Sequence, residues 1–165
     1  MDNPVFIIGT LLSIAFTLKI DPTTYKCNKS FISTLERQFI HGSPFHLLSN
    51  TYVFYQLTTI LGPMLGTQKY FGLTALLVAL NGLADYGLYG NDLIGCSVGF
   101  SGVIFSLLTW VLLTKKGFTQ QLAADLLILL APSVADKQIS FSGHLIGIIV
   151  GAIVYYISHF WGKIV

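Results

Sequence analysis

Four polar side chains in this sequence are of the types that perform acyl-transfer chemistry: Ser101, His144, His46 and Asn50. They lie near the starts of the second, fourth and sixth apolar segments of the chain. If successive apolar segments cross a membrane in alternating directions, these three segments begin on the same side. Their first residues then share a depth, where a serine with a neighbouring base can act as a nucleophile. The pattern predicts that the four side chains converge in one site.

The serine lies in the run Gly99-Phe100-Ser101-Gly102, at the junction between a glycine-containing loop and an apolar segment. The N-terminus of a helix offers free backbone N–H groups and a partial positive charge, which suit an oxyanion. A serine N-cap or a small-residue packing face is the alternative. Val103 stands where the nucleophile elbow G-x-S-x-G needs its last glycine, and the apolar helical pattern excludes an α/β-hydrolase.

The histidine of the sixth segment stands at the edge of a stripe of small residues. Gly143, Gly147 and Gly151 recur every four residues, so this helix face can approach a neighbouring helix closely. If the sixth segment packs on the fourth, with Gly102 keeping the approach open, His144 can reach Ser101 and act as its general base. A structural histidine bonded to a carbonyl is the alternative, but an ionisable group inside a membrane favours a functional role.

The second segment carries His46 and Asn50 at i and i+4, on one helix face, where both can donate hydrogen bonds to a developing oxyanion. Zinc is the competing hypothesis. His41 and His46 are five residues apart and straddle Pro44, and no H-E-x-x-H motif occurs, so neither a metal nor a cofactor is predicted.

The composition indicates a membrane protein. Of 165 residues, 53% are apolar and only 10% charged, and the mean hydropathy is +0.72, well outside the range of soluble proteins. Because buried polar groups would go unpaired in lone spans facing lipid, the segments must form a bundle. We therefore predict an all-α membrane protein, a single domain over residues 1–165. Its expected spans are residues 4–20, 45–62, 69–89, 101–115, 119–134 and 141–161.

The ends and loops add further expectations. Residues 4–20 lack the basic region and cleavage site of a secretory signal, so they are kept as a span. The net charge of +2 gives no case for nucleic acid. Lysines and arginines occur on both sides of the expected membrane, so charge does not choose the orientation. The long connection 21–44 contains an amphipathic stretch, expected to rest at the interface.

Two cysteines, Cys27 and Cys96, fall in loops that an alternating topology puts on the same side. A disulfide between them is conceivable, but two free thiols are the favoured interpretation. Asp125 in the fifth segment is expected to pair with a tyrosine, a lysine or a backbone group. Asn81 and Asp85 are expected to serve packing and the end of the third span.

Taken together, the motifs resemble those of the rhomboid intramembrane serine proteases. The resemblance rests on His46 and Asn50 after His41, on Gly99-Phe100-Ser101-Gly102, and on Gly143-His144 followed by Gly147 and Gly151. Their order and spacing match the family from about residue 37 to residue 161. Each motif alone is weak, and the combination is specific.

The resemblance implies a six-helix fold and cleavage of transmembrane protein substrates within the lipid bilayer. Ser101 would be the nucleophile and His144 the base, without an acidic third member. His46, Asn50 and the Ser101 N–H would form the oxyanion hole, and Phe105 would pack against the catalytic histidine. The runs around Ser101 and His144 most resemble eukaryotic endoplasmic-reticulum rhomboids, which points to a multi-pass protein of that membrane or another secretory-pathway membrane.

One departure from the family concerns the first loop, where a Trp-Arg pair is usual. Here only Glu36-Arg37 is found, closer to His46 than in most members. Two other functions remain open. A rhomboid-like protein without activity would bind membrane clients, although such members typically lose the serine or the histidine; a small transporter would have no need for Ser101.

Overall fold

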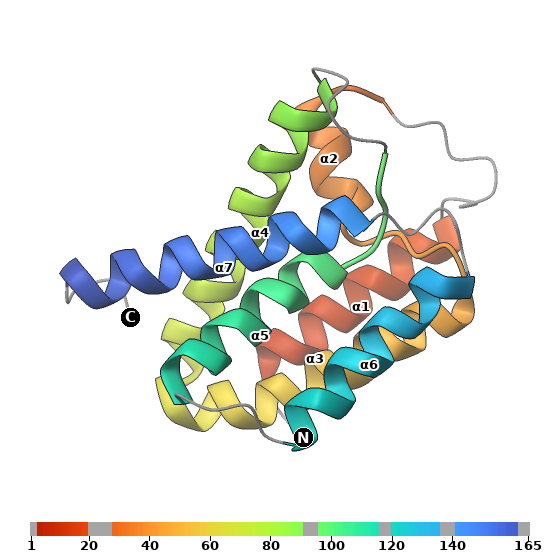
Figure 1. Ribbon diagram of the computed structural model, residues 1–165. Coiled ribbons are helices and arrows are strands. Elements are labelled where there is room, and N and C mark those ends of the chain that lie inside the picture. Colours follow the sequence, from red (N-terminus) through yellow and green to blue (C-terminus); the bar gives the residue numbers. More distant parts are fainter. Residues whose placement is uncertain (1–2, 20–27, 91–95, 116–119, 136–140, 162–165) are drawn as a thin grey trace.

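The computed structural model describes residues 3–19, 28–90, 96–115, 120–135 and 141–161. All regular secondary structure within these ranges is helical, which confirms the predicted all-helical class (Figure 1). There are seven helices: α1 (Pro4–Lys19), α2 (Phe31–Arg37), α3 (Pro44–Leu65), α4 (Thr67–Gly90), α5 (Ser101–Lys115), α6 (Gln120–Ala135) and α7 (Phe141–Trp161).

The largest difference from the predicted boundaries is at α3, which continues three residues beyond the expected end at 62. It begins where the Ser43 side chain accepts a hydrogen bond from the His46 N–H at 3.1 Å, with Pro44 in the first turn. Pro63 lies inside the last turns of the helix. The helix ends at Gly66, whose φ of 75° lies in the left-handed region that glycine favours.

The amphipathic stretch predicted between residues 21 and 44 forms the short helix α2. Ser30 caps it by accepting a hydrogen bond from the Ser33 N–H at 3.1 Å. Ile32 projects from the helix with 68% of its surface exposed, whereas Ile40, just beyond the helix end, is fully buried. The stretch is therefore a helix for only two turns, and its last apolar residues belong to a buried connection into α3.

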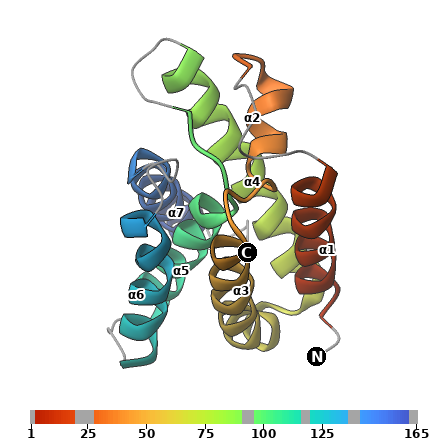
Figure 2. The same ribbon diagram turned by 90° about the vertical axis from the view of Figure 1, so that its right-hand side faces the viewer.

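Helix α5 lies at the centre of the bundle, and α7 packs along it more extensively than any other pair of helices. In Figure 1, α7 crosses in front of α4 and lies beside α5. Figure 2 shows α1 and α6 on opposite sides of the molecule, with α3 between them. The central helix is accordingly the most buried one, and its start is enclosed by α3, α4 and α7.

Glycines make the close contact between α5 and α7 possible. A Cβ on Gly147 would lie 3.0 Å from both the carbonyl carbon of Gly102 and Cβ of Phe105. A Cβ on Gly151 would lie 2.7 Å from Cα of Ser106. The stripe of small residues on α7 therefore faces the fourth apolar segment at backbone contact distance.

A chain of polar contacts runs across the same helices. The amide nitrogen of Asn81 in α4 donates to Oγ of Ser106 in α5 at 2.9 Å, and Oγ of Ser106 donates to the Gly147 carbonyl of α7 at 2.8 Å. Such bonds between helices satisfy polar groups that hydrocarbon could not. Ser106 therefore links α5 to both α4 and α7.

Two of the described helices are long and apolar enough to cross a membrane: Thr67–Tyr89, with 23 residues, and Phe141–Phe160, with 20. Three other apolar helices are shorter: Pro4–Lys19, Ser101–Thr114 and Gln120–Ala131. Large apolar side chains cover the outside of α1, α6 and α7, including Leu18, Leu127 and Phe160, each more than two-thirds exposed.

The favoured interpretation of two free thiols is wrong for Cys96, which is in a disulfide. Its sulfur also accepts a hydrogen bond from Nη1 of Arg37 at 2.9 Å. The other cysteine, Cys27, lies outside the described residues. Two cysteines in a sequence do not reveal whether the fold brings them together, so the pattern alone could not decide between the two states.

Candidate active site

The first residues of α5 and α7 place a serine and a histidine within hydrogen-bonding distance. Nε2 of His144 lies 3.1 Å from Oγ of Ser101, although 43 residues separate them in the sequence. Both residues are buried, with 5% of the surface of Ser101 and 2% of that of His144 exposed. A nucleophile and a base at this distance have the geometry that activation of a serine requires.

The histidine ring is fixed on its other side by an aromatic side chain. Phe105, one helical turn after Ser101, stacks on the His144 ring with 4.5 Å between the ring centroids and 28° between their planes. Nδ1 of His144 is buried, and no group among the described residues hydrogen-bonds to it. The ring is therefore oriented by packing and by Ser101, rather than by a carboxylate.

His46 and Asn50 lie beside the loop that leads into Ser101. Both side chains are almost fully buried, and both face Gly99. A Cβ at Gly99 would lie 2.7 Å from Nε2 of His46 and 3.6 Å from Nδ2 of Asn50, and the φ of Gly99 is 111°. Glycine is required here for both reasons. In the part of the chain that the structure describes, neither polar atom of the Asn50 side chain has a hydrogen-bond partner.

The start of α5 is also a helix N-terminus. The Phe100 carbonyl accepts the N–H of Ile104 at 3.1 Å, so Phe100 is the last residue before the helical hydrogen-bond pattern begins. The first N–H groups of a helix have no partner within it and carry the positive end of its dipole. Ser101 therefore combines a nucleophilic side chain with an environment suited to negative charge.

The last residue of α2 supports this loop, a role that the sequence did not reveal. Arg37 is 1% exposed and donates from Nη2 to Oδ2 of Asp85 in α4 at 2.6 Å. Its guanidinium lies 4.6 Å from the centroid of the Tyr89 ring, and its carbonyl accepts the Gly99 N–H at 2.9 Å. A buried arginine with a carboxylate partner 48 residues away leaves no local signal in the sequence.

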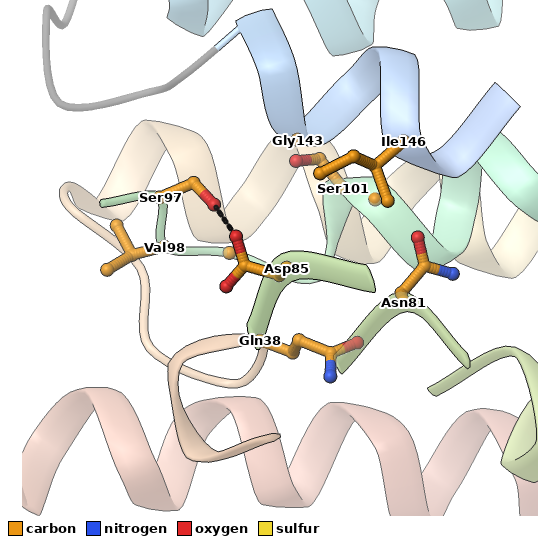
Figure 3. A pocket seen from close by; sticks show the side chains of 10 residues that line it. Gln38, Asn81, Asp85, Ser97, Val98, Ser101, Gly143 and Ile146 are labelled. Carbon is orange, nitrogen blue, oxygen red and sulfur yellow. Dashed lines mark hydrogen bonds between the residues drawn. The ribbon is translucent and has the colours of Figure 1, made fainter. Parts of the chain in front are cut away.

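A small cavity of about 30 Å³ lies beside Ser101. Figure 3 shows Gln38, Asn81, Asp85 and Ser97 around it, with the Ser97 hydroxyl donating to Asp85. Oε1 of Gln38 and Oδ1 of Asn81 are buried without a hydrogen bond to the described residues. The cavity is large enough for a water molecule, and these polar atoms in its largely apolar lining could bind one.

His41 is a buried histidine outside the helices. Burial and, to a lesser degree, the neighbouring His46 ring lower the pKa of His41 from 6.5 to about 3. The folded protein thus binds a proton on this ring less readily than the unfolded chain. Its contribution to stability is complete above pH 6.5 and is lost as the pH falls from 6.5 towards 3, by about 1.4 kcal/mol per pH unit.

This linkage gives a measurable expectation. Between pH 7 and about pH 4.5, the thermal unfolding midpoint of the detergent-solubilised protein should fall more steeply for the wild type than for a His41→Gln variant, because glutamine does not titrate. The difference between the two curves isolates this ring from every other titrating group. Parallel curves would show that His41 is not buried in its neutral form.

Asp125 in α6 is fully buried, and its Oδ1 accepts a hydrogen bond from Nε2 of Gln121 at 2.9 Å. The expected tyrosine, lysine or backbone partner is therefore replaced by a glutamine one turn earlier on the same helix. Asp125 takes no part in the contacts around Ser101. In the described ranges, no group of three histidine, cysteine or acidic side chains is placed to hold a metal ion.

Comparison with known proteins assigns the chain to a family. The family model of the Rhomboid domain matches residues 28–160. A protein of Acanthamoeba polyphaga mimivirus, named "Putative rhomboid protein L523", is 32% identical over 131 residues, covering 77% of this chain and 75% of its own length. With the family model matching most of the sequence and this relative aligned over three quarters of both chains, the protein belongs to the rhomboid family and is a membrane protein.

Proposed function

We propose that this protein is an intramembrane serine endopeptidase that cleaves transmembrane segments of other membrane proteins. The observation that carries the proposal is the 3.1 Å contact between Oγ of Ser101 and Nε2 of His144 at the buried start of the central helix. Membership of the rhomboid family supports it. No metal or cofactor is needed for this chemistry.

In the proposed reaction, Oγ of Ser101 attacks the scissile carbonyl while Nε2 of His144 takes the hydroxyl proton. The oxyanion that forms is stabilised by the His46 side chain, the Asn50 amide and the Ser101 N–H. When the C–N bond breaks, His144 returns the proton to the leaving amine, which leaves an acyl group on Ser101. A water molecule then attacks this ester while His144 takes its proton; the bond to Oγ breaks, and His144 returns the proton to Oγ of Ser101. The cavity beside Ser101 gives that water room.

We propose a six-span membrane domain over residues 1–165, in which all described helices except α2 cross the bilayer. Several of them are shorter than the roughly 20 residues that usually span hydrocarbon, but their outer faces carry the large apolar side chains that lipid favours. The disulfide at Cys96 supports a location of the α5 start in an oxidising compartment. A secretory-pathway membrane such as the endoplasmic reticulum fits these features.

Labelling with a fluorophosphonate tests the serine chemistry directly. The detergent-solubilised wild type should form a covalent adduct at Ser101, whereas Ser101→Ala should form none, because the nucleophilic oxygen is absent. Ser106→Ala is the matched control, since this serine lies on the same helix but donates to the Gly147 carbonyl. If the wild type remains unlabelled while correctly folded, binding of membrane clients without cleavage becomes the better explanation.

The proposed topology predicts where engineered cysteines react. In a background with Cys27 and Cys96 replaced by serine, a cysteine at position 43 should react with an impermeant maleimide from the lumenal or extracellular side. One at position 116 should react only from the cytosol, because the three proposed spans α3, α4 and α5 lie between the two positions. Both cysteines reacting from the same side would contradict the six-span arrangement.

A further inference from the structure

The side chain of His41 contacts two parts of the proposed catalytic site, the loop before Ser101 and the His46 ring. Its Nε2 lies 3.5 Å from the Phe100 backbone nitrogen, which donates to it. Its ring meets the His46 ring edge-on, with 4.9 Å between centroids. It is fully buried. Phe100 is the residue before the nucleophile, and His46 is a proposed oxyanion donor. One ring therefore contacts both the neighbour of the nucleophile and an oxyanion donor.

The opposite edge of the His41 ring is held by α1 and by the segment before α3. Nδ1 lies 3.2 Å from the Phe39 carbonyl and 3.4 Å from Oγ1 of Thr17. The backbone N–H of His41 donates to the same Thr17 oxygen at 3.1 Å. A carbonyl can only accept, so Nδ1 must carry the proton, and Nε2 is left with the lone pair that the Phe100 N–H needs.

The Phe100 peptide has little other freedom. Its ring stacks on Phe39 with 5.4 Å between centroids and meets Phe54 edge-on at 5.2 Å. The preceding N–H, that of Gly99, is bonded to the Arg37 carbonyl at 2.9 Å. The two amides before Ser101 therefore both depend on acceptors supplied by residues 37–41, and a buried N–H that loses its acceptor is costly.

From this arrangement we infer that His41 is a positioning residue, whose unprotonated Nε2 fixes the peptide before Ser101 while its ring aligns His46. The inference rests on the proposed hydrolytic function of Ser101. It assigns His41 no contact with the substrate, so its loss should act on turnover and leave substrate binding almost unchanged.

Two substitutions distinguish the effect of losing the hydrogen-bond acceptor from the effect of losing the size of the His41 ring. In His41→Gln, an amide oxygen can still accept the Phe100 N–H; in His41→Leu, a side chain of similar size has no acceptor. We expect His41→Leu to lower kcat by about 100-fold with KM within about twofold, as an error of about 1 Å in the nucleophile position can do. His41→Gln should recover at least tenfold of that loss. His159→Leu, a change at an exposed histidine near the end of α7, should leave both constants unchanged.

Nitrogen NMR of the ¹⁵N-histidine-labelled wild type provides a test that needs no activity. We expect one histidine, absent from the His41→Gln spectrum, with a protonated Nδ1 and an unprotonated Nε2 that do not change between about pH 8 and pH 5. A ring protonated at Nε2 in this range would overturn the inference, even if His41→Leu failed to fold.

The kinetic outcomes also separate this inference from the proposed function. If Ser101→Ala abolishes cleavage but His41→Leu cleaves like the wild type, the positioning role fails alone. Equal loss in His41→Leu and His41→Gln would overturn the acceptor role as well. If Ser101→Ala cleaves at the wild-type rate, the proposed function fails, and the NMR result still decides the state of the His41 ring.

Discussion

Replacing either Ser101 or His144 by alanine should lower the rate of cleavage of a transmembrane substrate by about 10⁶-fold, because residues that act as one catalytic unit are each indispensable. Neither substitution should unfold the protein, since each only shortens a side chain at the start of a helix. Cleavage in proteoliposomes, followed by gel electrophoresis, measures the effect. The substrate helix should carry a glycine or proline near the scissile bond, because an intact helix holds its carbonyls in hydrogen bonds.

Substitutions that lower kcat only partially should identify the oxyanion donors. His46→Ala and Asn50→Ala are each expected to reduce kcat by about 10²–10³-fold, the usual cost of one lost donor. Asp125→Asn is the matched control, because it changes a buried polar group that takes no part in the contacts around Ser101. A Ser101→Ala protein that cleaves at the wild-type rate would refute the serine mechanism.

Adding one methyl group to α7 should weaken the fold more than almost any other small change. In Gly151→Ala, the new Cβ would stand 2.7 Å from Cα of Ser106 and 2.9 Å from its carbonyl carbon. These are backbone atoms, so neither can rotate away and α7 must move off α5. Overpacking of this kind costs about 1–3 kcal/mol. We expect the thermal unfolding midpoint in detergent to fall by about 3–10 °C.

Gly72→Ala is the matched control for that measurement. Gly72 is also inside an apolar helix, but a Cβ there would meet nothing within 4 Å. Alanine should be neutral or stabilise the protein by about 0.4–1 kcal/mol, because glycine loses more freedom on folding. A Gly151→Ala protein as stable as Gly72→Ala would mean that α7 does not approach α5 so closely.

The helices could be predicted from the sequence because each apolar segment is bounded by local signals. Ser43-Pro44 starts α3 and Gly66 ends it, and such caps act within a few residues. The expected end at 62 is too early, because α3 continues through Pro63 and a proline near the end of a helix in a bundle is tolerated. The close approach of α7 to α5 could also be predicted, because glycines at every fourth position leave one face of a helix without side chains.

Contacts between residues that are distant in the sequence could not be predicted from such local signals. Nothing near Arg37 indicates that it binds Asp85, or that Cys96 is in a disulfide rather than a free thiol. Asn81 was assigned to packing because an asparagine inside an apolar helix has many possible partners, and only the tertiary fold selects Ser106. The roles of Ser101 and His144 remain predictions that the experiments above will decide.

The contact between α5 and α7 also determines when the proposed enzyme can first act during its own synthesis. The ribosome makes Ser101 43 residues before His144, and α7 follows α1 to α6 in the chain. A growing chain that has inserted α1 to α6 thus holds a serine without its base, in a bundle that lacks its most extensive helix pair. On the proposed mechanism, the enzyme cannot cleave proteins near the insertion machinery until α7 has entered the membrane and packed against α5.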